Sequence, residues 1–151
     1  MRKTIVAGVA LLLITVGMAA DSSANEPTNN NYSWANGANN QWNGNMTVFS
    51  AFALWATWTT PESITPTGDV DYLLMTCGSA HVYGTGISFT HANGDLDVEF
   101  YTPNGTYLGT SNGVTDGESM TFPSGTYSDI VMKVYGYAGA TNSYSPELSC
   151  D

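Results

Sequence analysis

The sequence predicts an all-β protein, an antiparallel β-sandwich or barrel, on three observations. Short apolar stretches recur along residues 46–151, several of them with strand-like alternation. Turn dipeptides such as Asn93-Gly94 and Asp116-Gly117 separate these stretches, at intervals of roughly 8 to 12 residues. No stretch after residue 24 carries the 3.6-residue apolar period of an amphipathic helix. We therefore expect a single domain over residues 46–151 with essentially no helix.

The expected strands follow from the apolar pattern. Residues 46–58 form one apolar stretch on both parities, which is typical of a central strand covered on both faces. The other predicted strands are Val70–Cys77, Val82–Thr90, Leu96–Tyr101, Thr106–Thr110, Glu118–Phe122, Tyr127–Tyr137 and Tyr144–Cys150.

Residues 1–24 have the layout of a secretory signal. A basic start, Met1-Arg2-Lys3, precedes the apolar run Ile5–Val16, and small residues allow cleavage after Ala20 or Ala24. An uncleaved anchor is the alternative, but the run is short for a membrane span of ~20 residues. We expect an exported protein, secreted or held at the cell surface, with no membrane span after cleavage.

The net negative charge of the chain limits the kinds of molecule that it can bind. The chain has 13 acidic and 3 basic residues, and removal of residues 1–24 leaves 12 acids with Lys133 as the one base. Such a surface repels nucleic acid and anionic lipid. We therefore expect no nucleic-acid partner.

Cys77 and Cys150 are the two cysteines. An even count in an exported chain favours a disulfide between them. Metal ligation by these thiols is the rival interpretation, and it is weak because no CxxC pair occurs and the two histidines are His81 and His91. If the strands that end at the cysteines are antiparallel neighbours, a bend is needed to bring their ends together.

Residues 25–45 form an Asn- and Gly-rich arm without helical or strand period. Tyr32, Trp34 and Trp42 lie in it as aromatic anchors. Asn-x-Ser/Thr sequons, potential glycosylation sites, occur at Asn31, Asn45 and Asn104.

Residues 94–100, GDLDVEF, alternate acidic and apolar side chains. As a strand, this stretch turns Leu96, Val98 and Phe100 to the core and three carboxylates to the other face. That acidic face is either simply solvated or part of a calcium site, since Ca²⁺ binds oxygen ligands. The carboxylates predicted as calcium ligands form two i, i+2 pairs, Asp69 with Asp71 and Asp95 with Asp97. They would crowd together if their strands were neighbours.

A series of short motifs spans residues 67–150: Asp69-Val70-Asp71-Tyr72, Gly94–Tyr101, Asn104-Gly105, Ser111 with Glu118, Gly125-Thr126-Tyr127, Val134–Tyr137 and Tyr144–Leu148. In order and spacing the series resembles the bacterial pre-peptidase C-terminal domain. The resemblance implies a jelly-roll-like β-sandwich, found beside the catalytic domains of secreted proteases and not itself catalytic. Relatives attached to collagen-degrading enzymes bind calcium and matrix. No peptidase domain precedes the motifs in this sequence, and residues 25–66 do not match the pattern, so we expect a self-sufficient binding or structural role.

We expect no enzymatic activity, because no GxSxG turn or other catalytic constellation is present. The first functional hypothesis is a structural subunit at the cell surface, which forms fibres when the arm adds a strand to the next subunit. Its expected contacts are Tyr32, Trp34, Trp42, Phe49 and Trp55. The alternatives are a calcium-assisted sugar-binding module and a secreted accessory or inhibitor of a peptidase. The predicted partners are therefore copies of the chain itself or cell-surface glycans.

Overall fold

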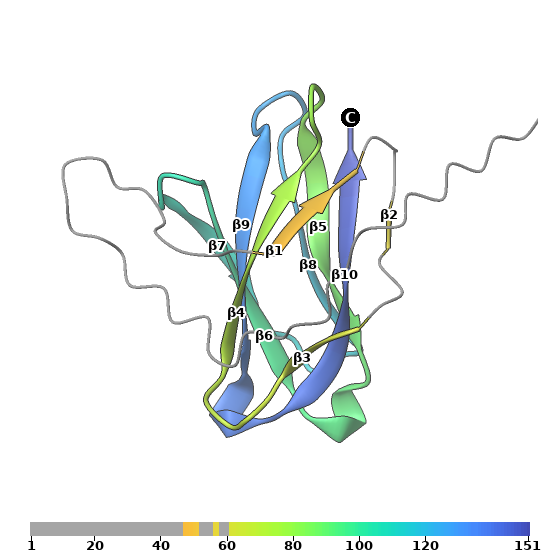
Figure 1. Cartoon of the computed structure of the whole chain (residues 1–151), viewed down its shortest axis with the longest axis vertical. Coiled ribbons are helices and arrows are strands. Elements are labelled where there is room, and N and C mark those ends of the chain that lie inside the picture. Colours follow the sequence, from red (N-terminus) through yellow and green to blue (C-terminus); the bar gives the residue numbers. More distant parts are fainter. Residues whose placement is uncertain (1–46, 52–55, 58–60) are drawn as a thin grey trace, which may run out of the picture.

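The computed structural model describes residues 47–51, 56–57 and 61–151, and they form two β-sheets packed face to face (Figure 1). This is the single β-sandwich domain that the sequence predicts. The apolar side chains between the sheets make up one core cluster. Its largest fully buried members include Tyr144, Phe100, Ile64, Leu73, Met75 and Met132.

The first sheet has the strand order β1-β4-β9-β6-β7. Its strands are β1 (Thr47–Ser50), β4 (Val70–Thr76), β9 (Asp129–Gly136), β6 (Leu96–Tyr101) and β7 (Tyr107–Ser111). All neighbours are antiparallel except β1 and β4, which are parallel. The strand β9 therefore lies between β4 and β6, although it follows both in the sequence.

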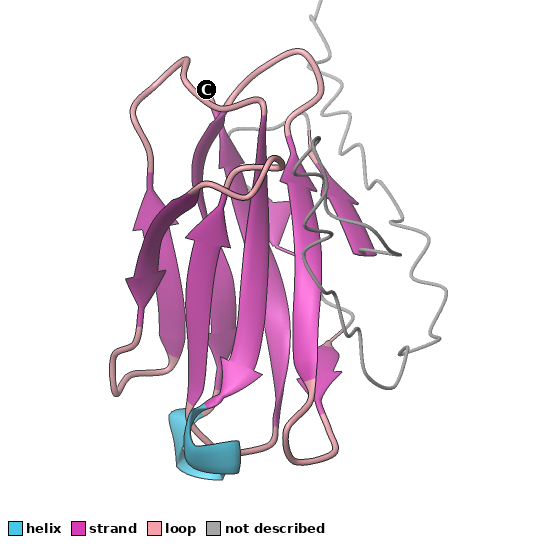
Figure 2. Ribbon diagram, turned by 90° about the vertical axis from the view of Figure 1, so that its left-hand side faces the viewer, coloured by secondary structure: helices cyan, strands magenta, loops and turns pink. Residues whose placement is uncertain are grey.

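The second sheet has the order β2-β10-β5-β8, and β3 pairs with β10 as well. Its strands are β2 (Ala56–Thr57), β10 (Asn142–Cys150), β5 (Val82–Phe89), β8 (Gly117–Thr121) and β3 (Glu62–Ile64). Two short 3-10 turns, η1 (His91–Asn93) and η2 (Tyr137–Gly139), lie at the same end of the sandwich (Figure 2). The described residues contain no α-helix, in agreement with the apolar pattern.

The alternating stretch at residues 94–100 folds as predicted. Leu96, Val98 and Phe100 on β6 are all 0% exposed and belong to the core. Because successive side chains of a strand point to opposite faces, Asp97 and Glu99 lie on the outer face of the first sheet.

The single strand predicted over residues 46–58 is wrong. Among the described residues of this stretch there are two short strands, β1, which pairs with β4 in the first sheet, and β2, which pairs with β10 in the second. Phe49, predicted as a partner contact, is 5% exposed and packs in the core, so it is not available to a partner in the folded chain.

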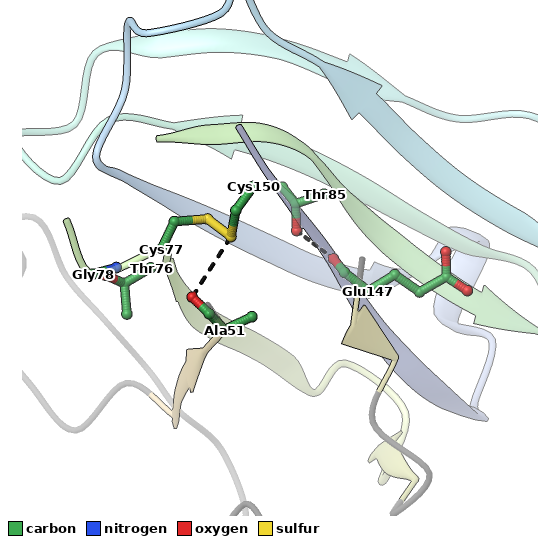
Figure 3. Close-up of a disulfide and its surroundings, with 7 residues drawn as sticks. All are labelled: Ala51, Thr76, Cys77, Gly78, Thr85, Glu147 and Cys150. Atoms are coloured by element: carbon green, nitrogen blue, oxygen red, sulfur yellow. Dashed lines mark hydrogen bonds between the residues drawn. A yellow bond between two sulfur atoms is a disulfide. The ribbon is translucent and has the colours of Figure 1, made fainter. Parts of the chain in front are cut away.

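Cys77 and Cys150 form the predicted disulfide, with their Cα atoms 5.8 Å apart (Figure 3). They follow β4 and end β10, which belong to opposite sheets. The two strands are therefore not antiparallel neighbours in one sheet. The disulfide joins the two layers, so no bend within a sheet is needed. The Sγ atom of Cys150 lies 3.6 Å from the carbonyl oxygen of Ala51, next to β1.

The predicted signal, residues 1–24, and the arm, residues 25–45, lie outside the described residues. Within the part of the chain that the structure describes, no helix has the length and apolar character needed to cross a bilayer.

Candidate functional site

The outer face of β4, β9, β6 and β7 carries four tyrosines. We call the surface made by Tyr72, Tyr101, Tyr107 and Tyr135, together with the polar residues between them, the tyrosine face. Strand alternation places them there, because their chain neighbours Leu73, Val134 and Phe100 point into the core.

Strand register aligns the polar residues of this face in one row. Tyr72 on β4 lies opposite Lys133 on β9, and Lys133 lies opposite Glu99 on β6. Glu99 in turn lies opposite Thr110 on β7. Directly opposed side chains on one face of a sheet are close enough to interact, so register alone brings an acid, a base and a tyrosine together.

Lys133, the one basic residue after position 24, lies at the centre of the tyrosine face. Its Nζ atom is 3.0 Å from Oε2 of Glu99 and 4.9 Å from the ring centroid of Tyr135. The cation is thus held by a carboxylate on one side and by the face of an aromatic ring on the other.

Glu99 is ionised by its neighbours. Burial alone would raise the pKa of this carboxyl, but hydrogen bonds donated by Tyr101 and Lys133, together with the charge of Lys133, lower it below its ordinary value. The same contacts act in the opposite direction on the phenol, because burial and the bond to the Glu99 carboxylate raise the pKa of Tyr101. Both groups are therefore held in fixed protonation states at neutral pH, Glu99 charged and Tyr101 neutral.

The tyrosine rings differ in exposure. Tyr107 is 55% exposed, and its ring meets that of Tyr101 edge to face, with centroids 5.5 Å apart. Tyr72 is buried and Tyr135 partly so. Burial raises the pKa of both phenols, with further contributions from Glu99 at Tyr72 and from Asp97 and Glu99 at Tyr135. The phenols of Tyr72 and Tyr135 therefore remain neutral at physiological pH.

Asp97 lies opposite Tyr135 on the same face. It is only 5% exposed, which is unusual for an outward-facing carboxylate. Burial raises its pKa, and the charges of Asp95, Glu118 and Glu99 add to the shift. Asp97 is thus less exposed than a carboxylate on a simply solvated face would be.

The four carboxylates predicted to share a calcium ion do not come together. Asp71 points into the interior, where the Tyr144 hydroxyl donates to its Oδ2 atom at 2.7 Å, while Asp97 lies on the outer face. Their strands β4 and β6 are separated by β9. Across the described ranges, no three His, Cys, Asp or Glu side chains form a set that could hold a metal ion.

The other two predicted calcium ligands have local partners. Asp69 accepts hydrogen bonds from the backbone N–H groups of Thr65 and Val70, each at 3.0 Å, and so stabilises the turn before β4. Oδ1 of Asp95 lies 3.1 Å from Nδ1 of His91 across the η1 turn. Calcium binding by one pair alone stays a prediction.

Glu118 is a buried carboxylate at the β7–β8 edge of the sandwich. It accepts a short hydrogen bond from the Ser111 hydroxyl and another from the Gly113 N–H at 2.9 Å. These contacts join the ends of the two sheets. Ser111 and Glu118, which carry part of the sequence resemblance, thus have a structural role.

The remaining predicted contacts fall mostly outside the described residues. Tyr32, Trp34, Trp42 and Trp55 lie there, as do the sequons at Asn31 and Asn45. The third sequon residue, Asn104, is exposed in the turn between β6 and β7. Lys133 and Tyr135 were not among the predicted site residues, although the lone base on an alternating strand was a usable signal.

Comparisons with known proteins bear on this fold. No protein-family model and no curated protein matches the sequence. The chain is similar in structure to a pre-peptidase C-terminal domain. The domain of a collagenase from Bacillus anthracis has a TM-score of 0.49 and 17% identity, and the match covers 72% of this chain and 99% of that one.

A second similar structure is PliG of Aeromonas hydrophila, a periplasmic inhibitor of g-type lysozyme. Its TM-score is 0.47 at 12% identity, and the match covers 70% of this chain and 97% of that one. The sequence resemblance to the pre-peptidase C-terminal domain and the two-sheet topology thus agree on a β-sandwich.

Proposed function

We propose that the chain is an exported, non-catalytic binding protein that docks on a protein partner through the tyrosine face. The observation that carries this proposal is the arrangement of Tyr101, Tyr107 and Tyr135 around Lys133 on an outer sheet face. Tyrosine is enriched in protein interfaces, because a rigid ring offers a large apolar area together with a polar tip.

Fixed geometry favours binding on this face. The Glu99 carboxylate holds both Lys133 and Tyr101, and the Tyr107 ring packs against Tyr101. Side chains already held in one arrangement lose little conformational entropy when a partner binds. The exposed Tyr107 side chain gives a partner its first contact.

Charge favours a partner that differs from the chain itself. After removal of residues 1–24 each copy carries 12 acids against one base, so two copies repel each other at low salt. A partner with a positive surface would be attracted by the same field and would associate faster. This supports the accessory or inhibitor hypothesis over self-association through the tyrosine face.

Fibre formation by the arm is a separate proposal. It rests on residues 25–45 and therefore on no contact described above. Deletion of residues 25–45 should convert an assembling protein into a folded monomer, and a full-length exported protein that stays monomeric at high concentration would refute it.

Site-specific photocrosslinking tests the proposed function. We would place a photoreactive phenylalanine analogue at Tyr107 and, as control, at Tyr83, which is 46% exposed on the other sheet. Irradiation in the native culture should give one heteromeric protein adduct from position 107 and none from 83. The adduct should be lost when Tyr101→Ala is added. No adduct, a dimer of the chain, or an adduct to a glycan would each contradict a protein partner.

A further inference from the structure

The end of the sandwich that carries η1 and η2 exposes apolar side chains. Val114, in the loop between β7 and β8, is 77% exposed, and Tyr137, in η2, is 61% exposed. These are the highest values among the exposed large hydrophobic side chains of the described residues. We call the loops that meet there, residues 90–95, 112–116 and 137–141, the loop end. Figure 2 shows η1 and η2 projecting beyond the strands at this end.

Hydrogen bonds hold the loop between β7 and β8 on both sides of Val114. On one side, the buried carboxylate of Glu118 accepts the Gly113 N–H at 2.9 Å. On the other side, Oδ1 of Asp116 accepts the His91 N–H at 2.8 Å, which ties this loop to η1. Val114 therefore lies between two attached points, while its own side chain is left to solvent.

The loop that carries Tyr137 is tied to the same neighbour. The Tyr137 N–H donates to the carbonyl oxygen of Asp95 at 2.9 Å. The side-chain amide of Asn142 donates to the carbonyl oxygens of Thr90 and Gly94, each at 2.8 Å. Residues 90–95 thus connect the other two loops, and the three form one linked unit.

The backbone beside Tyr137 is strained. Ala138 has a φ of 50°, the one positive value among the described residues other than glycine. Its side chain is exposed, so burial of that side chain does not account for the conformation. Residues of this kind persist where the surrounding contacts hold them, and they are frequent at binding sites, where they keep a neighbouring group in one orientation.

We propose that the loop end is a second protein-binding surface, with Val114 and Tyr137 as anchors in an apolar cleft of a basic protein. Loops on a rigid scaffold commonly carry binding function, and loops that are already tied together lose little entropy on binding. A projecting surface fits a concave partner. The aliphatic Val114 side chain offers no stacking platform for a sugar.

Charge selects the partner. The three loops contain two carboxylates, Asp95 and Asp116, and no lysine or arginine. The acidic chain around them attracts a positively charged protein and repels a second copy of itself. This inference goes beyond the proposed function, because none of its residues belongs to the tyrosine face.

Crosslinking with competition tests the loop end. We would place a photoreactive phenylalanine analogue at Tyr137 and irradiate the exported protein in the native culture. The adduct should contain a protein that mass spectrometry identifies as positively charged at pH 7 and crosslinked within an apolar cleft. An acidic protein, a dimer of the chain, an adduct to a glycan or no adduct would each overturn the proposal.

Unlabelled competitors show whether the two anchors carry the binding. The Val114→Ser, Tyr137→Ser double variant should compete for the adduct at least about tenfold more weakly than the wild type, as loss of interface anchors does. The matched control is Val48→Ser, Tyr83→Ser, which removes the same two side-chain types from exposed positions elsewhere. It should compete within about twofold of the wild type. Equal competition by the two double variants would overturn the proposal.

Salt tests the charge of the partner. Raising sodium chloride from about 0.05 M to about 0.5 M should slow adduct formation, because screening weakens attraction between opposite charges. A rate that does not change with salt would overturn a basic partner. Tyr107→Ala in the labelled protein should leave the adduct at position 137 unchanged, and its loss would assign the contact to the tyrosine face instead.

Discussion

The hydroxyl of Tyr144 donates a 2.7 Å hydrogen bond to Oδ2 of Asp71, and the two residues are 73 positions apart in the chain. Cys77 and Cys150 are separated by the same 73 positions. The strands β4 and β10 therefore run in the same direction in facing sheets, and a hydrogen bond at one end and a disulfide at the other join them. These two links fix how one layer lies on the other.

Tyr144→Phe should destabilise the fold. The phenyl ring keeps the core packing, but the change removes a buried hydrogen bond to a carboxylate, worth about 1.5 to 3 kcal/mol. Tyr83→Phe is the matched control, because Tyr83 is exposed, and it should stay within about 0.5 kcal/mol of the wild type. Urea unfolding of both variants measures the difference. Equal stability of the two would show that the Asp71 contact contributes nothing.

Loss of the disulfide should cost more. Closure of a 73-residue loop corresponds to about 4 kcal/mol in the chain-entropy model. The Cys77→Ser, Cys150→Ser double variant should therefore unfold at a much lower denaturant concentration than the oxidised wild type. Thiol titration of unfolded, unreduced protein provides the direct check, since two free thiols there would show that the bond is not formed.

Much of the fold could be predicted from local pattern. The strand Leu96–Tyr101 begins and ends at the predicted residues, because alternation and flanking turns define it. The short strand Glu62–Ile64 lacks such a pattern and was not predicted. It exists through its pairing with Asn142–Tyr144 on β10, a partner far along the chain. The apolar pattern therefore predicts strands that have an apolar face of their own. It does not predict strands that form only through pairing with a distant part of the chain.

The candidate site was harder to predict from the sequence than the fold. Alternation showed which side chains share a face within one strand, but it could not show which strands are neighbours. The insertion of β9 between β4 and β6 separates Asp71 from Asp97 and brings Lys133 beside Glu99 instead. Among the described residues the four predicted carboxylates are therefore not gathered in one place, and the outer face carries an ion pair within a row of tyrosines.

Gly136→Ala should destabilise the junction of β9 and η2. A Cβ atom at this position would lie 1.8 Å from the carbonyl oxygen of Ala140, so the backbone must move. Overpacking of this kind costs about 1 to 3 kcal/mol. Gly84→Ala is the control, since its nearest contact would be an ordinary 3.5 Å, and it should be close to neutral. Thermal unfolding measures both variants. Equal midpoints would show that the close approach of Ala140 to Gly136 does not matter for stability.

Asp97→Asn should stabilise the protein at neutral pH. The folded protein raises the pKa of Asp97 above its ordinary 3.8, so wild-type stability falls as the pH rises from 3.8 through the raised value. The neutral amide avoids burial of a charge among acids. The gain should be full at pH 7 and vanish below pH 3.8, as urea unfolding across this range would show. A variant less stable than the wild type at pH 7 would mean that the carboxylate has a stabilising contact in the free protein.

Glu99→Gln should have the opposite pH dependence. The folded protein lowers the pKa of Glu99 below its ordinary 4.5, so this carboxylate contributes stability above 4.5 and loses it as the pH falls through the lowered value. The amide can still accept the Tyr101 hydroxyl, but it leaves Lys133 without its counter-charge.

We expect Glu99→Gln to cost about 1 kcal/mol at pH 7, the upper end for an ion pair near the surface. The cost should disappear in acid, where the wild-type carboxyl is protonated and therefore uncharged, like the Gln amide. A double-mutant cycle with Lys133→Met isolates the pair, because the loss from Glu99→Gln should shrink once the ammonium is absent. An unchanged loss in the Lys133→Met background would assign the effect to the Tyr101 contact, and the ion pair at the centre of the tyrosine face would then have no measurable role in stability.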